Sequence, residues 1–125
     1  MPKKHVTLNP RSNLPFCSAV VAGDYIFLSG TAATRDENGE PLTTIEGQLN
    51  SCFVSMSKTL NSVGASLSDI VKVTCFLRNQ SDFAKMNEVY RSHFPGELPA
   101  RSTIVTDLVV TEMLLEIECI AYKPR

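Results

Sequence analysis

Apolar residues recur along the chain with two periods, which predict its helices and strands. The longest helical pattern begins near Thr43 and ends at Gly64. Its apolar residues are three and four positions apart, as in a helix that buries one face. Thr43 and Glu46 have the spacing of a capping box, and Gly64 can end the helix. The apolar stripe consists of Ile45, Leu49, Cys52, Phe53, Met56, Leu60 and Val63.

A second, shorter helix is predicted over residues 82–94, where apolar side chains again recur at helical spacing. Ser81 precedes this segment and is a residue type that caps helices, so we expect it at the N-terminus. The side chains expected to face inward are Phe83, Met86, Tyr90 and Phe94.

Strands account for the other apolar segments. The segment "CSAVVAGDYIFLSG" (17–30) predicts two strands joined at Gly23 and Asp24, a turn-prone pair. Residues 33–42 are polar and predict a loop. The last two strands would form a hairpin centred near residue 110. The further strands are expected near 5–8, at 69–77, at about 101–107 and at about 113–122.

The resulting order, βββ-α-β-α-ββ, indicates one α+β domain over residues 1–125, with a mainly antiparallel sheet and both helices on one face. In the last strand, Leu115, Ile117, Cys119 and Ala121 form one apolar row. The opposite row is also apolar at its ends, where Leu114 and Tyr122 lie, and Tyr25 and Phe27 oppose Ile26 and Leu28. A sheet with helices on one side and apolar residues on the other is typical of an oligomer.

Composition and charge narrow the function classes. Hydrophobic residues make up 43% of the 125 residues and charged residues 20%, as in an ordinary soluble protein. The net charge is −1 and no basic block is present, so a nucleic-acid partner is not expected. No stretch approaches the roughly 20 apolar residues of a membrane helix. We therefore expect a cytoplasmic protein without a membrane partner.

Metal and disulfide chemistry are not indicated. The cysteines form no C-x-x-C pair, and three of them fall in apolar periodic segments, where a thiol behaves as a small hydrophobe. His5 and His93 are far apart and have no neighbouring ligand pattern. The four cysteines are Cys17, Cys52, Cys75 and Cys119.

Few residues can carry chemistry. Arg101 heads a predicted strand, where a guanidinium is either a solvated or ion-paired strand end or a fork for an anion. Glu116 and Glu118 share one strand face and are either solvent-facing or contain a general acid/base. Ser29 has no adjacent histidine, which argues against a nucleophile. In the predicted hairpin, Arg101 and Glu116 lie on the order of 10 Å apart along the strands, so one small ligand reaches both if the side chains converge or if two subunits contribute.

Five segments, in order and covering nearly the whole chain, resemble the reactive intermediate deaminases, the RidA/YjgF family. The resemblance implies a fold like that of bacterial chorismate mutase and a homotrimer with a site in each cleft between subunits. It agrees with the two-sided sheet predicted above. The segments are "AGDYIFLSG" (22–30), "VGASLSDIVKVTCFL" (63–77), "DFAKMNEVYRSHF" (82–94), "PARS" (99–102) and "LLEIECIA" (114–121).

The activity that the resemblance implies is hydrolysis of enamines and imines such as 2-aminoacrylate to 2-oxo acids and ammonia, without a cofactor. By the same resemblance, Arg101 grips the substrate carboxylate and Glu116 positions or activates water. Ser29, Gly30 and Asn87 match further binding residues of the family.

Three positions depart from the family pattern. Phe16 replaces a tyrosine of the site, and Thr103 replaces a frequent cysteine after the P-A-R-S motif; we count both as substrate-binding residues. Thr31 replaces a glutamine after the S-G pair. Two alternative functions remain open from the sequence: a non-catalytic trimer that binds 2-oxo acids or acts as a chaperone, and an endoribonuclease.

Overall fold

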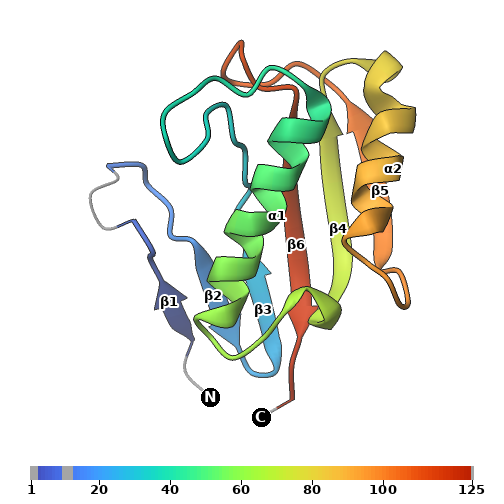
Figure 1. Cartoon of the computed structure of the whole chain (residues 1–125). Helices are drawn as coiled ribbons and strands as arrows, with labels where there is room; N and C mark the ends of the chain where they lie inside the picture. The colour runs from blue at the N-terminus through green and yellow to red at the C-terminus, as the bar shows by residue number, and fades with distance from the viewer. Residues whose placement is uncertain (1–2, 10–12, 125) are drawn as a thin grey trace.

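The computed structural model describes residues 3–9 and 13–124, which form one sheet with two helices (Figure 1). The predicted order of elements is confirmed. Two short 3-10 helices, Leu67–Asp69 and Gln80–Asp82, precede β4 and α2. The main elements are β1 (Lys4–Val6), β2 (Ala19–Ala22), β3 (Tyr25–Leu28), α1 (Ile45–Asn61), β4 (Ile70–Leu77), α2 (Phe83–Ser92), β5 (Ala100–Val105) and β6 (Leu115–Tyr122).

The strand order in the sheet is β1-β2-β3-β6-β4-β5, so the predicted hairpin of the last two strands is wrong. β5 pairs with β4 in parallel, because α2 carries the chain back to the starting end of β4. β6 then lies between β3 and β4 and is antiparallel to both. The other described pairings are antiparallel too, which confirms a mainly antiparallel sheet.

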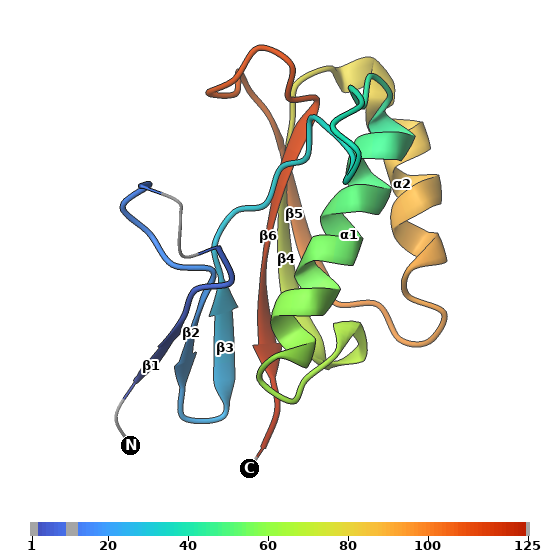
Figure 2. The same cartoon turned by 60° about the vertical axis from the view of Figure 1, so that its left-hand side comes forward.

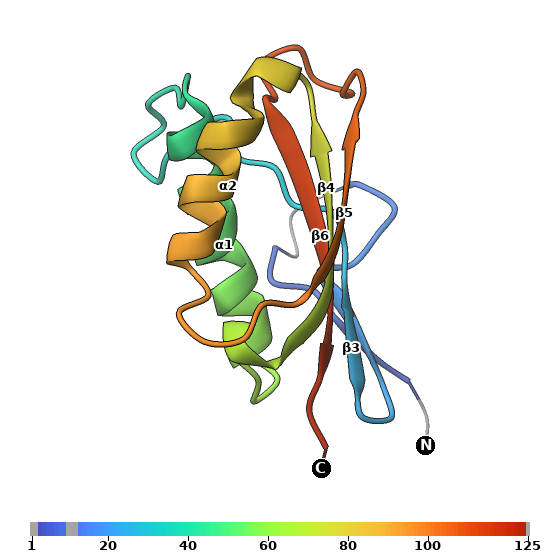
Figure 3. The ribbon, with the colours of Figure 1, turned by 90° about the vertical axis from the view of Figure 1, so that its right-hand side faces the viewer.

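Both helices cover the same face of the sheet, as predicted (Figures 2 and 3). Each helix connects two strands that run in the same direction, β3 to β4 and β4 to β5. Crossovers of this kind have one preferred hand, which places successive helices on one face. The homotrimer and the likeness to chorismate mutase stay predictions.

The core lies between this helical layer and the sheet. All seven residues of the predicted α1 stripe are buried, and so are the odd-numbered residues of β6. Met86, Tyr90 and Phe94 of the second helix also face inward as predicted. Phe83 does not: its side chain is 43% exposed, because it begins α2 and its ring lies beside Arg101 at the sheet edge.

Both predicted helix caps are displaced by one residue. Thr44, not Thr43, caps α1, and its hydroxyl accepts a hydrogen bond from the Gly47 N–H at 3.0 Å. Both threonines are residue types that cap helices, but only Thr43 has a glutamate three positions on, so the capping-box pattern favours the wrong one. Ser81 lies within the 3-10 helix, and Asp82 occupies the N-cap of α2.

The face of the sheet away from the helices carries large apolar side chains, as predicted. Tyr25, Phe27 and Tyr122 are each more than 40% exposed there. The ring centroids of Tyr25 and Tyr122 are 5.2 Å apart, so the side chains form a continuous aromatic surface. We call this side of the sheet the outer face.

All four cysteines are free, and three of them are buried. Burial raises the pKa of the Cys52 and Cys119 thiols to about 12 and that of Cys75 to about 11. These thiols therefore stay protonated near neutral pH and act as small core residues, as predicted.

A buried glutamine that the sequence analysis did not single out ties the loops to α1. Gln48 is completely buried. Its amide donates to the carbonyl oxygens of Leu42 and Glu112 at 2.8 and 2.9 Å and accepts from the Leu114 N–H at 2.8 Å. One side chain thus satisfies three backbone groups from two segments that flank the sheet.

We expect Gln48→Ala to lower the free energy of unfolding by about 2–4 kcal/mol, because it leaves these three backbone groups without partners. Urea unfolding would measure the loss. Gln80→Ala is the matched control, since Gln80 is exposed and should change stability by less than about 0.5 kcal/mol. Equal effects of the two substitutions would contradict this role for Gln48.

Candidate functional site

Arg101 is half-buried on the helix-covered face of β5, because its partner in β4, Val73, points into the core. One guanidinium nitrogen, Nη2, donates to Oδ1 of Asn87 at 2.7 Å. The guanidinium carbon lies 4.8 Å from the centre of the Tyr90 ring and 5.8 Å from that of Phe83. Three side chains of α2 therefore contact the guanidinium, one through a hydrogen bond and two through their aromatic rings.

No carboxylate among the described residues pairs with Arg101; the ion pairs found there involve Arg78, Lys85 and Lys123. The ion-paired strand end that the sequence left open is thus not observed in the described part of the chain. A guanidinium carries five N–H donors, and Asn87 engages Nη2 alone. The arrangement suits a planar anion such as a carboxylate.

A cavity of about 310 Å³ opens beside Arg101. It combines guanidinium groups with an amide, an aromatic ring and an apolar wall, and none of the described residues that line it is acidic. The lining residues are Asn87, Tyr90, Arg91, Leu98, Pro99 and Arg101. Its chemistry fits a small anion with a short apolar body.

Two hydroxyl groups near Arg101 have no hydrogen-bond partner among the described residues, those of Tyr90 and Thr103. Tyr90 is only 5% exposed, and burial raises its pKa to about 12, so its hydroxyl stays a donor at neutral pH. Thr103 lies two residues after Arg101 on the same face of β5. Buried hydroxyls normally find a partner, so their position next to an open guanidinium marks this end of the sheet as a candidate site.

Glu116 lies on the outer face of β6, between the completely buried Leu115 and Ile117. Its carboxylate packs against Gly30: a Cβ atom at Gly30 would overlap the carboxylate oxygen. The absence of a side chain at Gly30 therefore makes the room that Glu116 occupies. Glu118 shares this face and is exposed.

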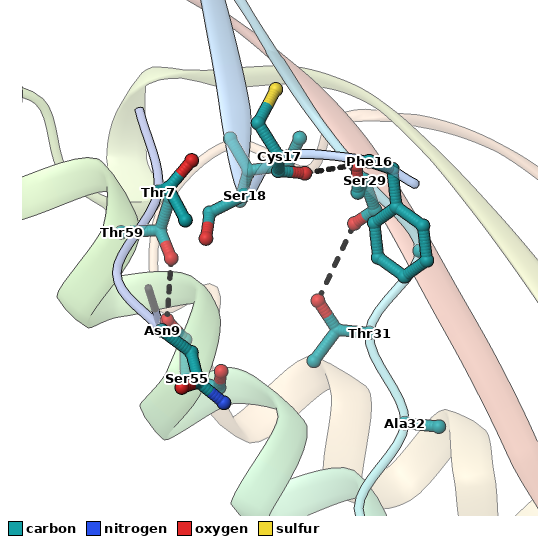
Figure 4. Close-up of a pocket in the computed structure, with 12 residues that line it drawn as sticks. Thr7, Asn9, Phe16, Cys17, Ser18, Ser29, Thr31, Ala32, Ser55 and Thr59 are labelled. Carbon is teal, nitrogen blue, oxygen red and sulfur yellow. Dashed lines mark hydrogen bonds between the residues drawn. The ribbon is translucent and has the colours of Figure 1, made fainter. Parts of the chain in front are cut away.

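Ser29, Gly30 and Phe16 line a second cavity, which measures about 320 Å³ (Figure 4). The Ser29 hydroxyl donates a hydrogen bond to the backbone oxygen of Cys17 at 2.6 Å. It therefore ties the end of β3 to the segment before β2 and is not placed as a nucleophile. Phe16 is 59% exposed. Hydroxyl groups from the loops and from α1, among them those of Thr31 and Thr59, complete the lining.

The structure thus divides the predicted site residues into two groups. Arg101, Asn87 and Thr103 lie on the helix-covered face, whereas Glu116 lies on the outer face against Gly30. Ser29 and Phe16 share with Gly30 the cavity that residues of α1 also line.

The predicted offset between Arg101 and Glu116 along the strands is present. Val73 of β4 pairs with both Arg101 and Cys119, and Phe76 pairs with both Ile104 and Glu116. However, β4 separates the two strands, and the two side chains point to opposite faces. One chain does not bring Arg101 and Glu116 together.

Comparison with known proteins identifies the family. The model of the endoribonuclease L-PSP family matches residues 7–123. The chain belongs to this family. The sequence-based resemblance to the reactive intermediate deaminases is therefore confirmed, since L-PSP relatives carry deaminase names.

A RutC family protein of Pyrococcus horikoshii is 36% identical over 115 residues, which cover 91% of each chain. A Dermatophagoides farinae relative named 2-iminobutanoate/2-iminopropanoate deaminase is 33% identical over 95% of each chain. The solved structure of a Thermotoga maritima protein named as a candidate endoribonuclease has a TM-score of 0.82 and 36% identity, covering 93% of this chain and 92% of that one. L-PSP relatives thus carry names of two different activities.

Within the described residues, no helix has the length and apolar character needed to cross a membrane. The described His, Cys, Asp and Glu side chains form no group of three that could hold a metal ion. The cytoplasmic location stays a prediction.

Sequence reasoning about the site missed Tyr90 and Arg91. Tyr90 was assigned to the core by its helical spacing, and the structure places it both in the core and under the guanidinium of Arg101. Arg91 follows Asn87 by four positions, so it lies on the same side of α2. That spacing was the available signal.

The contact of Gly30 with Glu116 is testable by a double-mutant cycle. We expect Gly30→Ala to cost about 1 kcal/mol of unfolding free energy in the native chain, because the carboxylate must move, and almost nothing when Glu116 is replaced by alanine. Urea unfolding of the single and double variants measures the coupling. Gly96→Ala is the control, since a Cβ there meets open space. Additive effects of the two substitutions would contradict the contact.

Proposed function

We propose that this protein hydrolyses small 2-imino acids, of the 2-aminoacrylate and 2-iminopropanoate class, to 2-oxo acids and ammonia. The observation that carries the proposal is Arg101: its guanidinium is held by Asn87 and Tyr90 and has no carboxylate partner among the described residues. Membership of the L-PSP family and a relative with an imine deaminase name support the same reaction.

The substrate carboxylate would accept two parallel hydrogen bonds from Arg101. This geometry fixes the plane of the conjugated carboxylate and imine, which a single ammonium group does not do. Asn87 and the Tyr90 ring hold the guanidinium before the substrate arrives, so little order has to be created on binding. The hydroxyls of Tyr90 and Thr103 are further donors near the same anion.

Glu116 would act on the water. An enamine such as 2-aminoacrylate first takes a proton at its terminal carbon and becomes the imine. Water then adds to the imine carbon: its oxygen forms the new C–O bond, Glu116 accepts a proton, and the imine nitrogen becomes an amine. The proton then passes from Glu116 to this nitrogen. The C–N bond breaks with its electron pair on nitrogen, and ammonia leaves as Glu116 takes the hydroxyl proton and the carbonyl forms. No cofactor enters the scheme, because the protonated imine is already electrophilic.

Two copies of the chain would form each site. Arg101 and Glu116 lie on opposite faces of one sheet, so the glutamate that meets a substrate on Arg101 would come from a neighbouring copy. The aromatic outer face gives a reason for such an assembly, since large exposed apolar patches on a soluble protein usually mark contact surfaces. We propose a homotrimer with the outer faces packed together.

Two of the three departures from the family pattern, Phe16 and Thr103, bear on the substrate. Phe16 keeps an aromatic wall near Gly30 and Ser29 but offers no hydroxyl. Thr103 places a hydroxyl, in place of a thiol, on the face that carries Arg101. Both changes alter polar contacts around the substrate and leave the carboxylate clamp intact.

Two alternatives would give different results in the laboratory. A non-catalytic trimer would bind 2-oxo acids at Arg101 without turnover. An endoribonuclease, the activity in the name of the family, would bind RNA with a strong dependence on salt. The net charge of −1 and the small cavity beside Arg101 favour a small anion. The deciding experiment generates 2-aminoacrylate with a serine dehydratase and measures whether the protein accelerates pyruvate release.

We expect Arg101→Ala to abolish turnover and to weaken pyruvate binding by roughly thirtyfold or more, because one partner of a desolvated charge pair is lost. Arg101→Lys should restore only part of the activity, because an ammonium lacks the planar fork. The assay above and calorimetric binding measure both effects. If Arg101 were only structural, the variant would melt at a lower temperature yet keep its activity per folded molecule.

The shared site can be tested by mixing two inactive variants. We expect Glu116→Gln to slow the reaction about 10²–10⁴-fold, as for a lost general base. Subunits with Arg101→Ala and subunits with Glu116→Gln, combined in equal amounts, should regain about one quarter of the wild-type activity, since a quarter of the contacts in a cyclic trimer then unite both native residues.

The control mixture combines Arg101→Ala subunits with Glu118→Gln subunits. Its activity should not exceed what the Glu118→Gln subunits contribute by themselves. Native mass spectrometry on the same samples gives the number of subunits. No recovery in mixed trimers, or a monomer at micromolar concentration, would rule out the shared site.

A further inference from the structure

Arg91 is a second guanidinium at the cavity beside Arg101. It lies one helical turn after Asn87, the residue that binds Arg101, so the two arginines flank Asn87 on one side of α2. Arg91 is exposed and makes no ion pair with a described residue. None of the described residues that line the cavity is acidic, so its two positive charges are not balanced within that lining.

We infer that this cavity selects 2-imino acids that carry a second carboxylate, with the first carboxylate on Arg101 and the second on Arg91. The inference rests on the proposed function and names its substrate class: 2-imino dicarboxylates of four or five carbons. The reaction is unchanged, because water replaces the imine nitrogen at the second carbon, ammonia leaves, and the distal carboxylate takes no part in bond making.

Three features of the cavity favour such a substrate. Two separate guanidinium groups match two separate anions, and a bound dianion would relieve the repulsion between like charges. Leu98 and Pro99 supply an apolar wall for the methylene groups between the carboxylates. The volume of about 310 Å³ leaves room beyond the three carbons of 2-iminopropanoate, which would engage Arg101 and leave Arg91 without an anion.

Arg91 also has a simpler role open to it. It lies in the last turn of α2, where a cation interacts favourably with the free carbonyl groups of the helix end. That role affects the stability of the protein and gives no preference between substrates. A comparison of substrates within one variant therefore separates the two roles.

The test generates imines in place with an L-amino acid oxidase acting on L-alanine, L-aspartate or L-glutamate, and traps the unhydrolysed imine with semicarbazide. We expect a higher kcat/KM for 2-iminosuccinate or 2-iminoglutarate than for 2-iminopropanoate in the native protein. In Arg91→Gln, the ratio of the two values should fall roughly fivefold, the upper range for an exposed ion pair. The preference should also shrink with added sodium chloride, which screens exposed charges.

Lys85→Gln is the matched control, since Lys85 is an exposed cation of the same helix, pairs with Glu88, and does not line the cavity. It should leave the substrate ratio unchanged. Arg91→Lys keeps the positive charge at the helix end and should retain part of the preference.

Equilibrium binding provides a readout that does not depend on turnover. We expect 2-oxoglutarate or oxaloacetate to bind the native protein more tightly than pyruvate, and this difference to shrink in Arg91→Gln. The native protein and Arg91→Gln could both turn over 2-iminopropanoate and show the same ratio of kcat/KM between the dicarboxylate imines and 2-iminopropanoate. That result would overturn this inference and leave the proposed function standing. No turnover of any imine, with the dicarboxylate binding preference still dependent on Arg91, would overturn the proposed function and support the two-arginine site.

Discussion

The pleat of the sheet is the constraint on which the candidate site depends. Successive residues of a strand point to opposite faces, so the odd-numbered Arg101 follows Val73 toward the helices, while Glu116 points away from them. β4 separates the two strands as well. No rotamer change brings the two side chains together within one chain, because the sheet itself lies between them. A reaction that needs both groups therefore needs a second copy of the chain.

The same alternation gives β6 two functions. Its odd-numbered residues are completely or almost completely buried under α1, and its even-numbered residues, from Glu116 to Tyr122, line the outer face. Glu116 lies at one end of the aromatic outer face. A contact made through the outer face would therefore have Glu116 at its edge. Assembly would close the outer face and carry Glu116 toward a neighbour's Arg101 in one step. The burial of one face of β6, the proposed assembly and the proposed catalysis all use this period-two pattern.

The sequence predicted what depends on local periodicity and missed what depends on pairing between distant segments. The order of elements and the buried stripe of α1 follow from spacing alone, and both are confirmed. The hairpin failed because nothing local to β5 and β6 reveals that β4 lies between them. Asn87 was matched through the family motif, whereas its contact with Arg101 depends on how α2 crosses β5. Gln48 escaped notice because a polar residue beside an apolar stripe has the same pattern whether it is exposed or bound to three backbone groups.

Tyr90 links the core to the proposed clamp. The Tyr90 ring packs in the core, where its centroid is 5.9 Å from that of Phe53 and 5.0 Å from that of Phe94. The guanidinium carbon of Arg101 lies 4.8 Å from the same centroid. The guanidinium thus rests on a ring whose own position is set by aromatic packing within the helical layer. In the proposed clamp, this packing would hold the N–H groups in place for a carboxylate, and no carboxylate of a described residue occupies them. The position of the clamp at the edge strand follows from the same packing, because α2 reaches β5 only at the edge of the sheet, where a second copy can also reach it.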